Sequence, residues 1–194
     1  MNNKNPLPEY NYILGSASPR RKQLLEGLNL EFKIIAPDID ETYPDDININ
    51  DIPVFLSNKK AEYFNNLKEN DLLICADTIV IINNIVLNKP TNNDDAKRML
   101  SLLSNNIHEV VTGVTFKSIN KLLSFSVKSV VHFKKLTIEE IDFYIKEFKP
   151  YDKAGSYGVQ EWIGYIGIEK IEGSYYNVMG LPIKEVYENL LVFK

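Results

Sequence analysis

The chain has 194 residues, a net charge of −4 and a pI near 5.3, and 44% of its residues are hydrophobic. This is enough apolar material for one core, so we expect a single domain over residues 1–194. The acidic balance argues against general nucleic-acid binding, and no apolar run approaches the ~20 residues of a membrane span. One cysteine, Cys75, excludes an internal disulfide and fits a reducing compartment. We therefore expect a cytoplasmic protein, since the polar start also lacks the apolar region of a signal peptide.

The first half of the chain alternates strand and helix patterns. Hydrophobic spacing and turn residues predict a short disordered start, a strand over 10–14, a helix over 18–28, a strand in 31–37, a long helix over 51–70 and a strand-rich segment over 71–90. Asn83 and Asn84 stand between two apolar runs, and because Asn tolerates positive φ they predict a tight hairpin turn. The opening is therefore a β-α-β unit followed by a helix and a hairpin.

The second half continues the same mixture. It predicts a helix over 91–104, paired strands over 108–119 and 122–136, a helix over 137–148, a hairpin in 163–178 that turns near Glu172 and Gly173, and a closing helix over 180–193. Thr137 and Glu140 form a capping box at the start of the helix over 137–148. We expect an α/β fold with one elongated mixed β-sheet flanked by helices and no linker dividing the chain.

The start of the helix over 18–28 breaks a local rule. Ser18 suits the N-cap and Pro19 the first helical position, but the first turn then carries Arg20 and Arg21 where its partial positive charge favours acidic residues. A bound anion, above all phosphate, would compensate by meeting both guanidinium groups and the backbone N–H groups. The alternative is that both arginines are solvated, at a cost of roughly a few tenths of a kcal/mol.

Asp77 and Thr78 interrupt an apolar run that would otherwise make a buried strand. Burying an isolated carboxylate is prohibitive, so Asp77 must be paired, hydrogen-bonded, bound to a metal, or placed at a strand end that faces a cleft. We favour the cleft over a structural salt bridge.

The segment DIDE is the second acidic feature. In an extended segment Asp38 and Asp40 point to one face and Glu41 to the other. Mg²⁺ takes one or two protein carboxylates and leaves its other positions to water and substrate phosphates, which suits Asp77 with one of these acids. The alternative is a solvated acidic loop.

Two lysines and a glycine-rich loop complete the candidates. By pattern alone Lys60, in the helix over 51–70, and Lys89, after the hairpin, are ordinary surface lysines. The segment DKAGSYGVQ is typical of a loop that brings backbone close to another group, or of an ordinary connection, and it ends in Gln160. The Gln160 amide offers one donor and one acceptor, which matches the N3–H and O4 edge of uracil or thymine.

Several familiar sites are not signalled. The chain contains no GxxxxGK[ST] loop, no GxGxxG after a strand, no GxSxG elbow and no HExxH. Its two histidines, His108 and His132, are far apart on strand segments, so we expect both to be structural rather than zinc ligands. Cys75 lies in an apolar run, which favours a buried, inert thiol.

Taken together, these segments resemble the Maf family of nucleoside triphosphate pyrophosphatases. The characteristic segments stand in the family's order as SASPRR, KKA, ADTIV, NKP, HEVVTGV, DKAGSYGVQ and GSYYNVMGLP, and they run along nearly the whole chain. The resemblance implies an α/β fold like that of inosine triphosphate pyrophosphatases (the Maf/Ham1 type), two lobes with a central cleft, a divalent cation (Mg²⁺ or Mn²⁺) and frequent homodimers.

The resemblance also implies roles for single residues. Asp77 matches the proton acceptor, and Glu41 resembles the acid of the metal and catalytic cluster, so the implied metal ligands are Asp77 and Glu41. Lys60 joins them as a catalytic residue that contacts phosphate. The implied substrate-binding residues are Ser16, Ser18, Arg20, Arg21, Thr78, Lys89 and Gln160.

Gln160 after YGV resembles the branch of the family that acts on dTTP and UTP, whereas the 7-methyl-GTP branch typically carries a glutamate in that region. The implied reaction converts a pyrimidine nucleoside triphosphate to the monophosphate and pyrophosphate. Glu161 and Trp162 depart from the family pattern, because many members have glycine after the glutamine. Three alternatives remain open: a pyrophosphatase that acts on modified pyrimidine triphosphates, a 7-methyl-GTP pyrophosphatase, and a nucleotide-sensing regulator of septum formation without significant turnover.

Overall fold

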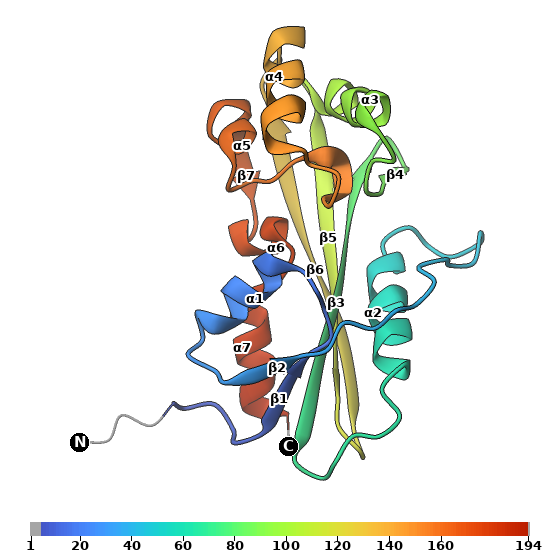
Figure 1. Ribbon diagram of the computed structural model, residues 1–194, viewed down its shortest axis with the longest axis vertical. Coiled ribbons are helices and arrows are strands. Elements are labelled where there is room, and N and C mark those ends of the chain that lie inside the picture. Colours follow the sequence, from blue (N-terminus) through green and yellow to red (C-terminus); the bar gives the residue numbers. More distant parts are fainter. Residues whose placement is uncertain (1–4, 194) are drawn as a thin grey trace. The chain divides into compact units, whose positions relative to one another are not determined.

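The computed structural model describes residues 5–193, and Figure 1 shows the order of their helices and strands. The strands are β1 (Asn11–Leu14), β2 (Phe32–Ile34), β3 (Asp71–Ile82), β4 (Ile85–Leu87), β5 (Ile107–Lys117), β6 (Leu122–Phe133) and β7 (Ile168–Glu172). The helices are α1 (Pro19–Glu26), α2 (Ile52–Glu62), α3 (Asn93–Leu103), α4 (Ile138–Phe148), the 3₁₀ turn η1 (Ala154–Ser156), α5 (Trp162–Gly167), α6 (Tyr175–Met179) and α7 (Ile183–Val192). Within residues 5–193 no helix combines the length and the apolar character that crossing a membrane requires.

The strands form one mixed sheet in the order β2-β1-β3-β5-β6-β7, and β4 pairs with β3. Strand β1 is parallel to both β2 and β3, whereas β4 is antiparallel to β3 and β7 antiparallel to β6. The hairpin between β3 and β4 turns at Asn83 and Asn84, whose φ angles are 50° and 60°. The predicted mixed α/β sheet, its parallel β-α-β opening and this hairpin are confirmed.

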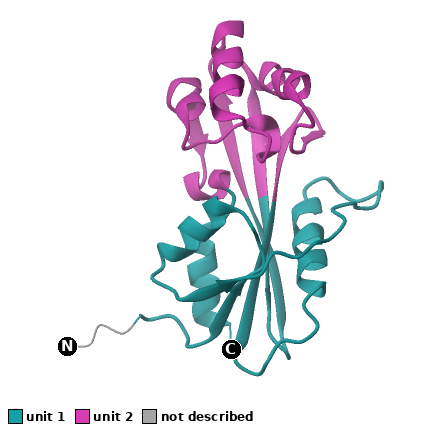
Figure 2. Ribbon diagram, viewed as in Figure 1, with its two compact units in different colours: residues 1–77, 112–127, 180–194 teal, residues 78–111, 128–179 magenta. Residues whose placement is uncertain are grey.

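The chain divides into two compact units, which Figure 2 shows in different colours. Unit 1 comprises residues 1–77, 112–127 and 180–194, and unit 2 comprises residues 78–111 and 128–179. The strands β3, β5 and β6 contribute residues to both units. The boundary in β3 falls between Asp77 and Thr78, the polar pair that interrupts the apolar run.

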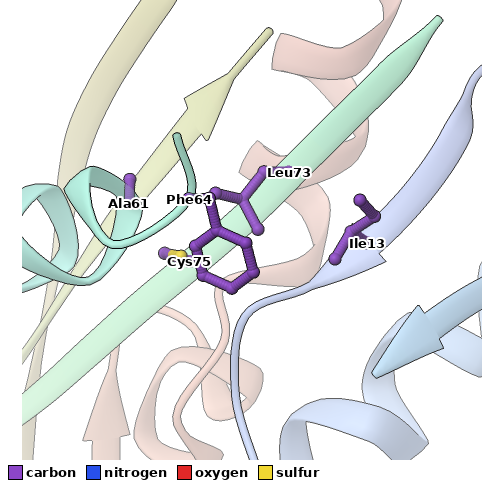
Figure 3. Close-up of a cluster of buried hydrophobic side chains, with 5 residues drawn as sticks. All are labelled: Ile13, Ala61, Phe64, Leu73 and Cys75. Atoms are coloured by element: carbon purple, nitrogen blue, oxygen red, sulfur yellow. The ribbon is translucent and has the colours of Figure 1, made fainter. Parts of the chain in front are cut away.

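In unit 1, α2 lies on one side of the sheet and α1 and α7 lie on the other (Figure 1). Five buried side chains from β1, α2, the segment just after α2, and β3 pack together on the α2 side: Ile13, Ala61, Phe64, Leu73 and Cys75 (Figure 3). Burial raises the pKa of the Cys75 thiol to about 12, against the opposing effect of nearby cations. Cys75 is therefore the buried, inert thiol that the sequence predicts.

In unit 2, α3 contacts α4 and η1, and α4 contacts α5. The predicted capping box of α4 is present, because the Thr137 hydroxyl accepts from Glu140 N (3.2 Å) and the Glu140 carboxylate accepts from Thr137 N (2.8 Å). His108 is buried, and its Nε2 lies 2.8 Å from the Tyr157 hydroxyl, while His132 Nε2 lies 2.8 Å from Glu172. Both histidines thus have partners within the fold.

The expected long helix over 51–70 is wrong, because α2 ends at Glu62. Lys117 Nζ donates to the carbonyl oxygens of Ala61 and Phe64, at 2.9 Å each, and so satisfies acceptors that a continuing helix would use. Sequence periodicity could not reveal this, since Lys117 comes from the distant strand β5.

The hairpin expected in 163–178 is also wrong. Residues 162–167 form α5, β7 pairs with β6, and a second helix, α6, follows Gly173. Gly173 does turn the chain, with φ at 110°, but Ser174 Oγ then accepts from Asn177 N (3.2 Å) and caps a helix rather than a returning strand.

The start of the chain is ordered from residue 5, contrary to the expected disorder. The Asn5 side chain donates to the carbonyls of Leu28 (2.9 Å) and Asn29 (3.0 Å), and Leu7 is buried. Residues 1–4 of the expected disordered start lie outside the described residues.

Candidate active site

The start of α1 has the predicted cap. Ser18 is the N-cap in extended conformation, its hydroxyl accepts from Arg21 N at 3.4 Å, and Pro19 is the first helical residue. Ser16, which is buried, accepts from Ser18 N (3.2 Å) and from an Arg21 guanidinium nitrogen (3.2 Å). Ser16, Ser18 and Arg21 therefore form one connected turn at the amino end of the helix, where N–H groups favour an anion.

Arg21 is anchored rather than free in solvent. Its Nε donates to the carbonyl of Gly180 at 2.8 Å, so α1 is tied to the segment that leads into α7. Burial lowers the pKa of the Arg21 guanidinium, while the negative charges of Asp77 and Glu41 act in the opposite direction. The interpretation of Arg21 as a solvated surface residue is thus wrong, because Arg21 is partly buried and hydrogen-bonded within unit 1.

Lys60 is the centre of the second cluster in unit 1. It lies in the last turn of α2, and its Nζ is 2.5 Å from Asp77 Oδ1 on β3 and 2.8 Å from Glu41 Oε1. The side chains of Lys60 and Asp77 are only 10% and 11% exposed, whereas that of Glu41 is 46% exposed. The pattern-based expectation that Lys60 is an ordinary surface lysine is wrong, and Asp77 has the charged partner that its burial requires.

In the acidic loop, Asp40 and Glu41 have different partners, as the alternation of an extended segment predicts. Asp40 accepts from the Thr42 hydroxyl (2.6 Å) and Thr42 N (3.1 Å), while Glu41 reaches Lys60. Lys59, which the sequence analysis did not single out, donates from Nζ to the Thr42 carbonyl at 2.9 Å. Lys59 and Lys60, two successive residues of α2, therefore both hold this loop. The only sequence signal for Lys59 was its position next to Lys60.

These groups form one electrostatic neighbourhood. The pKa of Arg21 responds to Arg20, Glu41 and Asp77, and the last two also contact Lys60. Three cationic side chains thus stand with two carboxylates in unit 1. A surplus of positive charge at a helix start suits a polyanionic ligand.

The carboxylates of Glu41 and Asp77 also provide a test of the expected metal. Both converge on the Lys60 ammonium group, so they already share one cationic partner. Among residues 5–193 no group of three or more His, Cys, Asp and Glu side chains is arranged to hold a metal ion. The protein offers two converging carboxylates, which fits Mg²⁺ or Mn²⁺ only as a cation that takes its remaining oxygens from water and phosphate.

The other expected substrate residues belong to unit 2. Thr78 is partly buried on β3, Lys89 is exposed just after β4, and Gln160 is partly buried before α5. Gly155 N donates to the Asn88 carbonyl at 3.2 Å, so the glycine-rich loop is bonded to the segment that carries Lys89. The Gln160 Oε1 atom is buried and has no hydrogen-bond partner among the described residues, which leaves an acceptor that a ligand donor would satisfy.

Sequence reasoning missed three residues around Gln160. Glu161 accepts from the Tyr144 hydroxyl of α4, and its other oxygen lies 3.1 Å from the buried Lys153 Nζ. The available signal was two opposite charges, Lys153 and Glu161, at the two ends of a glycine-rich loop. Tyr144 carried no signal of its own, because it stands on the apolar face of an amphipathic helix.

A family model described as Maf-like protein matches residues 11–193. A protein from Parabacteroides distasonis named dTTP/UTP pyrophosphatase is 49% identical, over 96% of this chain and 98% of the relative. Proteins of the same name from Phocaeicola vulgatus (48% identical, 95% and 96% covered) and Flavobacterium johnsoniae (46% identical, 96% and 97% covered) are similar along their whole length.

Proposed function

Because the chain belongs to the Maf family, we propose that it hydrolyses dTTP and UTP to the nucleoside monophosphate and pyrophosphate. The family match over residues 11–193 confirms the resemblance inferred from the sequence motifs. The observation that carries the reaction is the contact of Lys60 with both Asp77 and Glu41, in the same electrostatic neighbourhood as Arg21. The relatives named dTTP/UTP pyrophosphatase match nearly the full chain, which supports dTTP and UTP as the substrates.

The cationic groups of unit 1 account for triphosphate binding. Arg20, Arg21 and the N–H groups at the start of α1 present positive charge at one helix end, and Ser16 and Ser18 shape the turn beside them. Lys60 adds a third cation. For Lys89 we propose the phosphate-contacting role on the family resemblance alone. These charges neutralise the triphosphate and the negative charge that develops on the leaving pyrophosphate.

The reaction itself is attack of water on the α-phosphorus. The new bond joins the water oxygen to phosphorus, the α–β phosphoanhydride bond breaks, and its electron pair leaves with pyrophosphate. Asp77 accepts the proton of the attacking water or fixes its orientation, and Lys60 holds the Asp77 carboxylate in place at 2.5 Å. Positioning and charge neutralisation supply most of the rate increase.

Glu41 and Asp77 would hold the divalent cation, Mg²⁺ or Mn²⁺, together with oxygens of the substrate. When bound, such an ion polarises phosphoryl oxygens and neutralises their charge. Lys60 contacts both carboxylates, so its ammonium group offsets the repulsion between them.

Base recognition falls to Gln160, with Thr78 beside the catalytic Asp77 in β3. The buried Oε1 of Gln160 accepts from the N3–H of thymine or uracil, and its amide nitrogen donates to O4. A carboxylate at this position could accept twice but not donate, which suits guanine instead. Gln160 thus favours dTTP and UTP over 7-methyl-GTP.

The test is a pyrophosphate-release assay with Mg²⁺ and with Mn²⁺ across dTTP, UTP, CTP, GTP and 7-methyl-GTP. We expect the wild type to release pyrophosphate fastest from dTTP and UTP. In Gln160→Glu, kcat/KM for both substrates should fall about tenfold, since about one hydrogen bond is lost. Release from 7-methyl-GTP alone would show the other branch of the family. No release from any substrate would show a binding protein and end the enzymatic proposal.

We also propose the domain organisation, the cellular location and the oligomeric state of the protein. We propose that both units work as one domain, because the family match spans residues 11–193. The enzyme would act in the cytoplasm on free nucleotides rather than on nucleic acid, in keeping with its net charge of −4. We also propose a homodimer, which light scattering on the purified chain tests directly.

A further inference from the structure

We propose that Tyr144 and Glu161 are positioning residues for base recognition: they fix the turn that presents Gln160. This inference rests on the proposed function, in which Gln160 reads the base. It assigns a purpose to Glu161 and Trp162, the two residues that depart from the family pattern, and to a buried ionic group that the reaction does not use.

The turn that carries Gln160 spans residues 158–161. Glu161 N donates to the Gly158 carbonyl at 3.0 Å, so Val159 and Gln160 are the two central residues of a β-turn. The Gln160 carbonyl also accepts from the Tyr165 hydroxyl at 2.7 Å. The backbone of Gln160 is thus held directly, whereas its amide oxygen remains for a ligand.

Tyr144 closes the turn from α4. Its hydroxyl accepts from Gly158 N at 3.0 Å and donates to the Glu161 carboxylate, so one oxygen atom binds the first and the last residue of the turn. Tyr144 is fully buried and its ring stacks on Phe148 at 5.1 Å between centroids. A side chain locked by packing in this way holds its partners more rigidly than a solvated one does.

Lys153 fixes the other side of Glu161. Its buried Nζ lies 3.1 Å from Glu161 Oε1 and 2.7 Å from Asp152. Both oxygens of Glu161 are therefore in use, one with Lys153 and one with Tyr144. A carboxylate bound at both oxygens has a single orientation, and this orientation is passed to the adjacent Gln160.

Two glycines show how closely the turn is packed. A Cβ atom on Gly158 would lie 2.7 Å from Cδ of Glu161, and one on Gly164 would lie 2.0 Å from the Val159 carbonyl oxygen. Both contacts are closer than real Cβ atoms allow. The close approach of α5 to the Val159 backbone therefore requires glycine at position 164, whereas a side chain at position 158 would displace the Glu161 carboxylate.

Trp162, the second departure, docks the same segment on α4. Its ring lies 4.8 Å from that of Phe143, the neighbour of Tyr144 in α4. Glu161 and Trp162 thus bind successive residues of one helix. Together they join the Gln160 turn to α4, which a glycine after the glutamine could not do.

The experiment measures base discrimination in both binding and turnover. Calorimetry with the α,β-methylene analogues of dTTP and dCTP gives a ratio of affinities, and kcat/KM for dTTP and dCTP gives a ratio of rates. Tripolyphosphate binding serves as a measure of the phosphate site alone. The variants are Tyr144→Phe, which removes only the hydroxyl, and Glu161→Ala and Glu161→Gln, the second of which keeps an acceptor for Tyr144.

We expect Tyr144→Phe and Glu161→Ala to lower both ratios about tenfold, the scale of about one misplaced hydrogen bond, with tripolyphosphate affinity unchanged. Glu161→Gln should restore most of the discrimination. The matched control is Tyr157→Phe, which removes another buried hydroxyl of unit 2, bonded to His108 at 2.8 Å. It should lower the melting temperature but leave both ratios as in the wild type.

The outcomes separate the two proposals. If the wild type discriminates and Tyr144→Phe and Glu161→Ala discriminate equally well, the positioning role is overturned and the proposed function stands. If the wild type binds both analogues alike or neither, base reading by Gln160 fails and the inference fails with it. Should Tyr144→Phe not fold, the comparison of Glu161→Ala with Glu161→Gln decides the same question.

Discussion

Two buried lysines, one in each unit, make similar ion pairs but serve different roles. Lys60 is 8% exposed and contacts Asp77 and Glu41, and Lys153 is 7% exposed and contacts Asp152 and Glu161. In both groups one ammonium meets two carboxylates. The residues around each group decide what it can do.

Around Lys60, Arg20 and Arg21 add positive charge at the start of a helix. Around Lys153 two carboxylates face a single cation, and Tyr144 occupies the second oxygen of Glu161. The first group can therefore attract a polyanion, whereas the second is complete in itself and holds a turn. A buried ion pair alone does not distinguish a catalytic site from a structural one.

Asp77→Asn tests the Lys60 group most severely. The amide keeps the shape of the side chain but cannot accept the proton of the attacking water, so we expect turnover to fall ~10²-fold or more with the fold retained. Pyrophosphate release and thermal unfolding measure the two effects. Asp40→Asn is the control, because Asp40 bonds to Thr42 rather than to Lys60. Near-normal turnover in Asp77→Asn would remove Asp77 from catalysis.

Lys153→Met should lower mainly the stability of the protein, whereas Lys60→Met should lower mainly its turnover. Without Lys153, Glu161 keeps only Tyr144 as the partner of its partly buried carboxylate, which should cost about 1–3 kcal/mol in the free energy of unfolding. Urea denaturation of both variants, beside kcat for dTTP, makes the comparison. Equal losses of turnover in the two variants, at saturating dTTP, would contradict the distinction between the groups.

His108 predicts a pH dependence of stability. Burial lowers the pKa of folded His108 to about 3, while the unfolded chain protonates this side chain below pH ~6.5. The unfolded state therefore binds more protons between these values, and stability falls as pH decreases. We expect a loss of about 2 kcal/mol at pH 5 relative to pH 8.

Urea denaturation at pH 8 and pH 5 measures this loss. His108→Phe should remove this contribution, while His132→Gln, in which the changed side chain lies beside Glu172, should keep it. A wild-type curve and a His108→Phe curve with the same pH dependence would show that His108 is not held neutral in the folded protein.

Local signals in the sequence sufficed for most of the secondary structure. The Ser18 cap, the capping box of Thr137 and Glu140, and the turn at Asn83 and Asn84 each depend on residues a few positions apart. The prediction failed where a distant residue intervened, as at the end of α2, whose carbonyls bind Lys117. It failed again after Gly173, where one glycine is compatible with both a hairpin and a helix start.

The sequence alone determined the chemistry of this protein: arginines at a helix start, a carboxylate in an apolar strand, and an amide after a glycine-rich loop. The tertiary structure alone decided which of these groups meet. Lys60 reaches Asp77 across 17 positions, and Arg21 reaches Gly180 across 159. Such contacts arise when helices and strands pack, and side-chain spacing along one element carries no record of the partner on another.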